Sequence, residues 1–151
     1  MDQLQRFMDA QKDNYYIALR EMKEGSKRTH WMWYVFPVIK GLGSSDYAHL
    51  YGLDYPVEAK SFLAHPLLGQ RLREITDAVL SHPGKSIRSI MSTSVDTWKF
   101  KACMTLFDAI SPNDIFDKAL NTFFAGQRDW KTLLKLNTSN SPVVLNPKAG
   151  G

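Results

Sequence analysis

The most telling stretch of this chain is His30-Trp31-Met32-Trp33-Tyr34-Val35-Phe36-Pro37-Val38-Ile39-Lys40-Gly41-Leu42-Gly43. The six positions after the histidine hold four of the eighteen aromatic residues of the chain. A soluble protein rarely leaves so much contiguous apolar surface exposed, because such a surface promotes aggregation. The stretch therefore forms either the centre of the core or the floor of a pocket.

Length and composition indicate an ordinary soluble domain. A chain of 151 residues is long enough for one domain with its own core, and 44% hydrophobic with 23% charged residues is typical of globular proteins. The net charge of +4 is too small to indicate nucleic-acid binding. The single cysteine, Cys103, excludes an internal disulfide framework, so we expect a cytoplasmic protein.

We expect neither a signal peptide nor a membrane span. The first residues are polar and lack an apolar segment of the kind that signal peptides carry. The longest uncharged apolar run, Trp31 to Ile39, is far shorter than the roughly 20 residues that cross a bilayer.

Apolar periodicity and capping residues predict a mainly α-helical chain with little or no sheet. A short helix capped by Ser44 or Ser45 is expected to reach Leu50. The segment Trp31 to Ile39 remains ambiguous between a strand and a buried helix, because Pro37 argues against a long regular element of either kind. The other helices are expected over residues 2–24, 54–64, 66–81, 86–91, 95–110, 111–125 and 130–136.

The predicted organisation is a single multi-helical domain over residues 1–136. Residues 137–151 are rich in Asn, Ser, Pro and Gly and are expected to form a flexible C-terminal tail. No internal repeat and no linker divides the chain.

Several polar residues beside the aromatic stretch are candidate ligand contacts. Gln11 interrupts the apolar stripe of the first predicted helix, on which Tyr15 also lies. The Gln11 amide either contacts a ligand or makes a structural hydrogen bond, because an unpaired buried amide is costly. Lys27 precedes the stretch, and His30 begins it.

A second group of candidates lies at the start of the helix predicted from residue 95. Asp96 and Lys99 are three residues apart and therefore project from the same side. They are either a capping acid and a solvated lysine, or an acid and a cation at a pocket rim suited to ribose or phosphate. Trp31 and Trp33 either pack in the core or stack on a nucleobase.

The order of motifs resembles a known family. It includes Gly25-x-Lys27-x-x-His30-Trp31-Met32-Trp33, Phe36-Pro37 and His65-Pro66-Leu67-Leu68-Gly69. This pattern resembles the bacterial and fungal domain of unknown function 1810 family, whose members are often mislabelled calpastatin. The resemblance covers roughly residues 3 to 136 and implies a predominantly helical single domain without an established activity. Val38 and Ala102-Cys103 depart from the family pattern, in which more polar residues are usual.

A second, more distant similarity concerns short motifs only. Gln-x-x-x-Tyr-x-x-Ala, Glu-Ala with Leu-Gly-x-Arg, and Trp-Lys with Met on one helix are similar to motifs of NADAR proteins. Those proteins are linked to NAD-derived ligands and to the removal of ADP-ribose-type groups. The similarity therefore implies a nucleotide-like small-molecule partner.

Two hypotheses follow from these observations. In the first, Gln11, Tyr15, Lys27, Trp31 and Trp33 bind an ADP-ribose-like or NAD-derived ligand. If the protein hydrolyses an N-glycosidic bond, Asp96 would stabilise a developing oxocarbenium ion and His30 or Lys99 would assist the leaving group. In the alternative, the protein is a non-catalytic interaction module whose aromatic stretch is structural core. We predict no metal site, because no histidine pair has the zinc-protease spacing, and no cofactor.

Overall fold

The computed structural model describes residues 3–140 of the chain. Within this range the chain forms ten α-helices and no β-sheet, which confirms the mainly α-helical class. The helices are α1 (Gln5–Gln11), α2 (Tyr15–Glu24), α3 (Met32–Val35), α4 (Asp46–Tyr51), α5 (Val57–Ala64), α6 (Leu68–Leu80), α7 (Ile87–Met91), α8 (Ser94–Ile110), α9 (Ile115–Phe124) and α10 (Trp130–Asn140).

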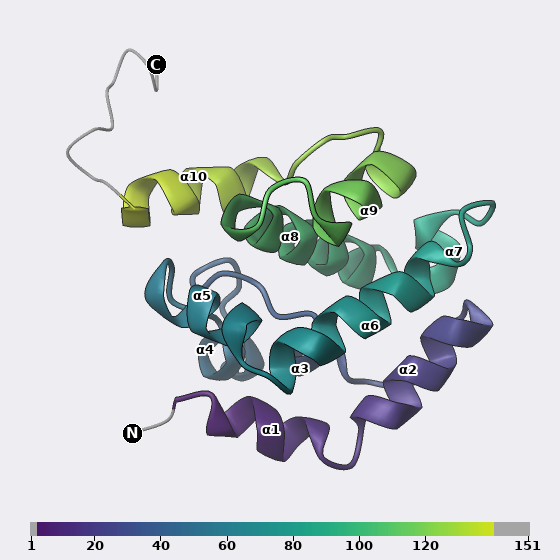
Figure 1. Cartoon of the computed structure of the whole chain (residues 1–151), viewed down its shortest axis with the longest axis horizontal. Helices are drawn as coiled ribbons and strands as arrows, with labels where there is room; N and C mark the ends of the chain where they lie inside the picture. The colour runs from purple at the N-terminus through teal and green to yellow at the C-terminus, as the bar shows by residue number, and fades with distance from the viewer. Residues whose placement is uncertain (1–2, 141–151) are drawn as a thin grey trace.

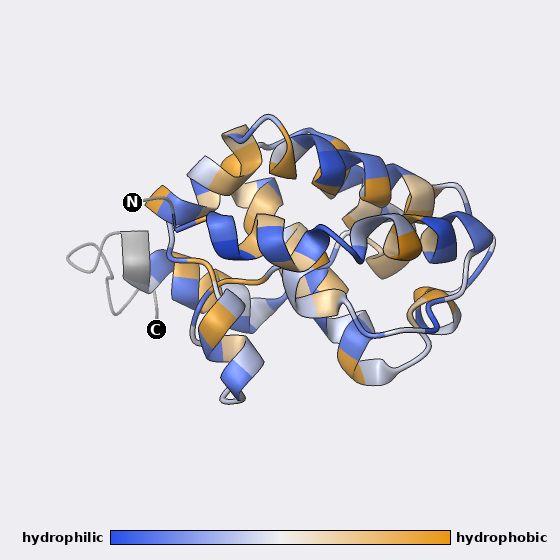
Figure 2. Cartoon of the chain, turned by 90° about the horizontal axis from the view of Figure 1, so that it is seen from below, coloured by the Kyte–Doolittle hydropathy of each residue, from blue (hydrophilic) through white to orange (hydrophobic). Residues whose placement is uncertain are grey.

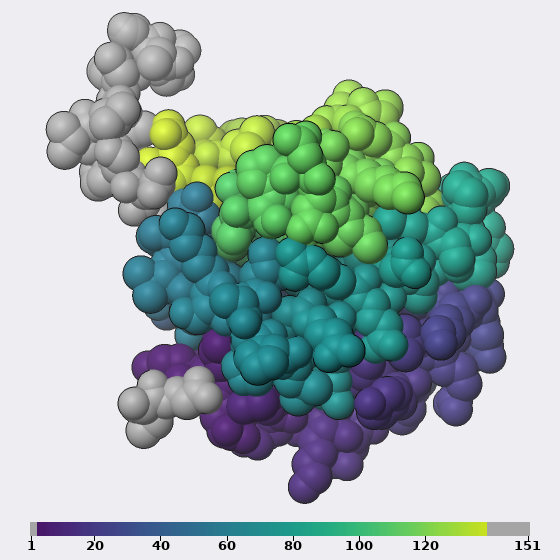
Figure 3. Space-filling view, in the orientation of Figure 1, coloured from purple at the N-terminus to yellow at the C-terminus, as the bar shows by residue number. Residues whose placement is uncertain are grey.

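Helix α6 runs through the middle of the molecule and connects its two sides (Figure 1). It packs against α2 and α5 on one side and against α9 on the other. Helix α8 packs against α5, α7, α9 and α10. In the space-filling view the N-terminal helices and the C-terminal helices lie at opposite ends, with the central helices between them (Figure 3).

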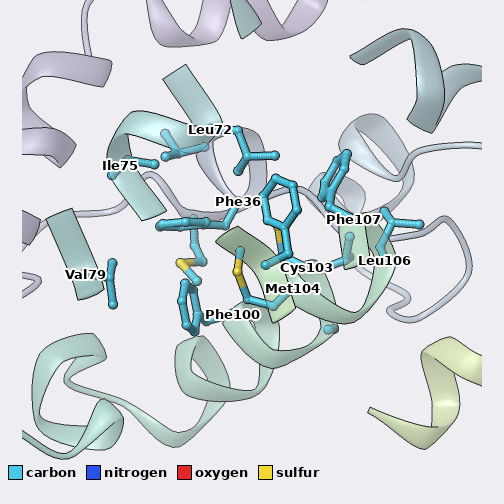
Figure 4. Close-up of a cluster of buried hydrophobic side chains, with 14 of the residues drawn as sticks. Phe36, Leu72, Ile75, Val79, Phe100, Cys103, Met104, Leu106 and Phe107 are labelled. Carbon is cyan, nitrogen blue, oxygen red and sulfur yellow. The ribbon is translucent and has the colours of Figure 1, made fainter. Parts of the chain in front are cut away.

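The core is built by amphipathic helices, along which polar and apolar positions alternate (Figure 2). One part of it brings together buried side chains from α6, α8 and the segment after α3 (Figure 4). Cys103 lies fully buried in this cluster, and burial raises the pKa of its thiol well above the usual value, as expected for an inert core thiol. The labelled members of the cluster are Phe36, Leu72, Ile75, Val79, Phe100, Cys103, Met104, Leu106 and Phe107.

The helix predicted over residues 2–24 is two helices, because the chain bends at residues 12–14. At the bend, Asn14 Nδ2 donates a hydrogen bond to the Ala10 carbonyl at 3.2 Å. Helix α1 packs against α3, whereas α2 packs against α6. The bend thus allows one continuous apolar pattern to cover two differently oriented partners.

The aromatic stretch forms a single helical turn, α3, and then extended backbone. Lys40 N donates to the Leu53 carbonyl at 2.9 Å, and Leu53 N donates to the Val38 carbonyl at 3.0 Å. This isolated pairing satisfies backbone groups beyond Pro37, where a longer helix could not continue. As predicted, Ser45 caps the next helix, since its Oγ accepts a hydrogen bond from Ala48 N.

Several helix ends differ from the predicted ones: α5 begins at Val57 rather than at residue 54, and α9 and α10 differ as well. Helix α9 begins after Asp114 rather than Ser111, because Asp114 accepts from Ile115 N while Ser111 Oγ donates to the Asp114 carboxylate. Helix α10, whose start is capped by Asp129, continues to Asn140, beyond the predicted end at residue 136. Residues 141–151 of the predicted tail lie outside the described residues.

Among residues 3–140, no helix combines the length and the apolar character that crossing a bilayer requires.

Candidate functional site

A pocket of about 270 Å³ lies beside the aromatic stretch. Its walls come from the loop before α3, from α3 itself, from α4 and from the first turns of α8. Six of the eight site residues predicted from the sequence line it; a wider hollow of about 740 Å³ at the start of α9 contains none of them. The lining residues are Lys27, His30, Trp31, Met32, Trp33, Tyr34, Tyr47, Asp96 and Lys99.

Three charged side chains meet in this pocket. Asp96 Oδ2 is 2.9 Å from Lys27 Nζ, and Asp96 Oδ1 is 3.5 Å from Lys99 Nζ. Lys27 is 7% exposed and Lys99 is 8% exposed, so both ammonium groups are largely removed from water. Asp96 is the sole acidic residue among those that line the pocket, which leaves one positive charge uncompensated.

The two lysines have different surroundings. Lys27 Nζ also donates to the Thr29 carbonyl at 2.6 Å and lies 4.9 Å from the centre of the Trp31 ring. Lys99 Nζ has the longer ion pair with Asp96 and lies 4.0 Å from the centre of the Trp33 ring, a favourable cation–π distance. Lys27 is thus held on more sides than Lys99.

Electrostatics at Lys99 reflect this imbalance. Burial lowers the pKa of the Lys99 ammonium below its usual value. Asp96 acts in the opposite direction, and the positive charge of Lys27 lowers the pKa further. The net lowering indicates that the surroundings do not fully compensate the charge of Lys99.

The start of α8 places Asp96 and Lys99 in the pocket. Thr93 caps the helix, because its Oγ1 accepts a hydrogen bond from Asp96 N at 3.0 Å. Asp96 therefore lies in the first turn, where the helix dipole stabilises an anion. The three-residue spacing brings Lys99 to the same side of the helix, as predicted.

Sequence reasoning missed Glu21, which holds the loop before α3. This residue is 3% exposed, and its carboxylate accepts hydrogen bonds from Arg28 N (2.8 Å), Thr29 N (3.1 Å), Thr29 Oγ1 (2.7 Å) and Trp31 Nε1 (2.9 Å). Burial by itself raises the pKa of Glu21, but these hydrogen bonds outweigh it and lower the pKa to about 2. The one signal in the sequence is an acid beside the apolar stripe of α2.

Gln11 and Tyr15 lie outside the pocket lining. Gln11 is buried behind α3, where its Nε2 donates to the Tyr34 carbonyl at 2.8 Å and its Oε1 accepts from Arg71 at 3.3 Å. This contact matches the structural alternative for Gln11, and it supports the pocket wall from behind. The Tyr15 hydroxyl donates to Glu74 Oε1 at 2.5 Å and lies 3.1 Å from the Arg71 carbonyl oxygen, and burial raises its pKa.

The aromatic lining divides into a sealed part and an accessible part. Trp31 is 2% exposed, and its indole N–H is bonded to Glu21, so neither face is free for a ligand to stack on without rearrangement. Trp33 is half-buried, and His30 and Tyr47 are exposed at the rim. Trp33 is therefore the better stacking surface of the two tryptophans.

The described part of the chain contains no cluster of side chains that could bind a metal ion. Across residues 3–140, His, Cys, Asp and Glu side chains do not gather in groups of three or more. The chemistry that the pocket offers is that of two cations, one carboxylate and aromatic rings.

Comparison with known proteins places the chain in a family. Residues 1–136 match the family described as "Protein of unknown function (DUF1810)". The chain is also similar to the crystal structure of the conserved hypothetical protein Rv1873 from Mycobacterium tuberculosis. The two share 40% sequence identity and superpose with a TM-score of 0.85, over 89% of this chain and 96% of the other. No curated protein matches.

These findings confirm the family resemblance seen in the sequence, whereas the similarity to NADAR proteins stays a prediction. On the match over residues 1–136, the chain belongs to the DUF1810 family of proteins of unknown function.

Proposed function

We propose that the pocket binds a nucleotide-like ligand through an anionic phosphate group held by Lys99. The observation that carries this proposal is that two buried ammonium groups share one carboxylate. The shorter pair, Lys27 with Asp96, is a balanced ion pair. A phosphate next to Lys99 would compensate the remaining charge and form short charge-assisted hydrogen bonds.

The aromatic lining supplies the second part of the recognition. Trp33 is half-buried beside Lys99, and Tyr47, which is 57% exposed, lines the same pocket. Bases and sugars pack on such rings without sequence-specific hydrogen bonds. The combination of a cation and accessible aromatic side chains suits a phosphate joined to a ribose or a base.

Volume limits the size of the bound group. Pockets that enclose drug-sized ligands usually measure about 300–1,000 Å³, and this one measures about 270 Å³. The pocket therefore suits a mononucleotide or one phosphate-bearing end of an ADP-ribose-like or NAD-derived molecule.

Binding is better supported than cleavage of an N-glycosidic bond by Asp96. A carboxylate assists that reaction by facing a developing cation. Both oxygens of Asp96 are already within ion-pair distance of ammonium groups, which would repel a further cation. The accessible Trp33 and His30 likewise favour a pocket over an interaction module in which the aromatic stretch is entirely core.

A thermal-shift titration tests the proposal with AMP, ADP-ribose, NAD, inorganic phosphate and adenosine at millimolar concentration. A ligand that binds only the native state raises its stability, and for a domain of this size each kcal/mol gained raises Tm by about 2–4 °C. We expect AMP to raise Tm and adenosine, which lacks the phosphate, to have little effect.

Variants of α8 provide the control. Lys99→Met keeps the aliphatic stem but removes the charge and should abolish the shift. Lys101→Met, on the same helix and over the Phe124 ring rather than in the pocket, should leave it intact. No shift with any phosphate-bearing compound, or an equal shift in Lys99→Met, contradicts the proposal.

A further inference from the structure

We propose that Glu21 is the positioning residue of this pocket, because its carboxylate holds the loop that carries Lys27 against Asp96. The expected effect of Glu21 on ligand affinity rests on the proposed function, whereas its effect on the position of Lys27 does not. Glu21 does not line the pocket and would act through the loop of residues 26–31.

The contacts of Glu21 are concentrated on that loop. Its two carboxylate oxygens accept four hydrogen bonds, two from backbone N–H groups and two from the side chains of Thr29 and Trp31. All four donors are uncharged, so the carboxylate remains ionised through hydrogen bonds rather than through an ion pair. A buried carboxylate used in this way fixes the backbone of several consecutive residues at once.

The end of α7 also holds the loop. Lys27 N donates to the Ile90 carbonyl at 2.8 Å, and Ser92 Oγ donates to the Lys27 carbonyl at 2.6 Å. Ser92 has a φ of 74°, which is strained for a residue with a side chain. The loop is therefore held both by α2 and by the strained turn at the end of α7.

The consequence for the pocket follows from the position of Lys27. With its backbone fixed, its ammonium reaches the Thr29 carbonyl and Asp96, at 2.6 and 2.9 Å. This arrangement occupies one carboxylate oxygen at short range and leaves Lys99 with the longer contact of 3.5 Å. Glu21 thus determines which of the two lysines neutralises Asp96 and which remains available to a ligand.

The test measures lysine reactivity in the absence of ligand. Reductive methylation with formaldehyde and borohydride, followed by mass spectrometry, gives the modification rate of Lys27 relative to that of Lys101. In Glu21→Gln we expect Lys27 to react about tenfold faster than in the wild-type protein, because the loop opens more often. An unchanged relative rate in a folded Glu21→Gln protein overturns the proposal.

The matched control is Glu58→Gln. Glu58 is also a shielded carboxylate, with an ion pair to Arg6 at 2.9 Å and a hydrogen bond from Asp54 N, but these partners lie outside the loop of residues 26–31. Its substitution should lower stability without accelerating Lys27. Equal acceleration in both variants would assign the effect to general loosening and overturn the proposal.

A second variant keeps the test decisive if Glu21→Gln does not fold. Thr29 is exposed, and its Oγ1 donates one hydrogen bond to Glu21. Thr29→Val removes this donor and keeps a side chain of similar shape. It should raise the modification rate of Lys27 to a smaller degree, and an unchanged rate contradicts the proposal.

Titration with AMP then separates the role of Glu21 from the proposed function. If wild-type protein does not bind AMP, the proposed function fails, while the role of Glu21 is still decided by the reactivity of Lys27.

Discussion

The carboxylates of Glu21 and Asp96 both contact the loop of residues 26–31 and are used in opposite ways. Glu21 is surrounded by four uncharged donors and remains a single, fully bonded negative charge. Asp96 faces two ammonium groups, so its single negative charge compensates only one of the two positive charges. The comparison teaches that a buried carboxylate satisfied by neutral donors fixes structure, whereas one with an excess of cations leaves charge for a ligand.

Of the substitutions considered, the one that removes the Asp96 charge should lower the free energy of unfolding the most. Asp96→Asn leaves two buried ammonium groups without a counter-ion, which typically costs about 3–5 kcal/mol. Urea denaturation should show this loss in the free energy of unfolding. Millimolar inorganic phosphate should recover part of it in the variant, and sodium chloride at the same ionic strength should recover less. A variant as stable as the wild type would show that the two lysines do not depend on Asp96.

Glu21 should contribute to the acid sensitivity of the protein. Its pKa is about 2 in the folded state and 4.5 ordinarily, so its stabilising effect is complete above pH 4.5 and is lost as the pH falls towards 2. The difference corresponds to about 3 kcal/mol in the free energy of unfolding. Asp114, whose pKa is also lowered to about 2, chiefly by Arg73, adds to the same loss.

Urea denaturation at a series of pH values tests this contribution. The stability of Glu21→Gln should fall less steeply between pH 4.5 and 2 than that of the wild type. Asp114→Asn should remove a separate part of the slope. Parallel curves for wild type and Glu21→Gln would contradict the low pKa of this residue.

Much of the fold was predictable because capping and periodicity are local. The helices predicted after Ser44 or Ser45, from residue 95 and from residue 130 begin within about a residue of those positions, where Ser45, Thr93 and Asp129 cap them. The break between α1 and α2 was not predictable, because tertiary packing on two partners decides it. The start of α9 was misplaced because Asp114 competes with Ser111 as the capping residue.

The candidate site was likewise predictable only where a contact depends on residues close together in the sequence. The spacing of Asp96 and Lys99 predicts their proximity, since one helix turn fixes it. The meeting of Lys27 with Asp96 depends on a loop and a helix far apart in sequence, and was proposed only from residue type. Glu21 was missed because an acid beside an apolar stripe gives no local indication of its partners.

A smaller loss of stability is expected on substitution of Gln11, which supports the pocket from behind. Gln11→Leu removes the donor to the Tyr34 carbonyl and should lower the free energy of unfolding by about 1–2 kcal/mol. If AMP binds, its affinity should fall only modestly, because α3 shifts without losing a charged contact. Loss of AMP binding as complete as in Lys99→Met would instead place Gln11 in direct contact with the ligand.

The smallest effect on stability is expected at His30. Its side chain is exposed at the pocket rim, so His30→Ala should change the free energy of unfolding by no more than about 0.5 kcal/mol. Urea denaturation checks this value. A loss of several kcal/mol would mean that His30 belongs to the packed structure rather than to the rim.

The claim that the pocket at Trp33 and Lys99 binds a phosphate-bearing ligand is tested most directly by the indole N–H signals of the four tryptophans. In a ¹⁵N-labelled protein titrated with AMP, after assignment by single Trp→Phe variants, the Trp33 signal should shift in a saturable manner. The signals of Trp98, bonded to Asp129, and of the exposed Trp130 should stay in place. No shift of Trp33 at millimolar AMP, or a shift confined to Trp130, would contradict the account.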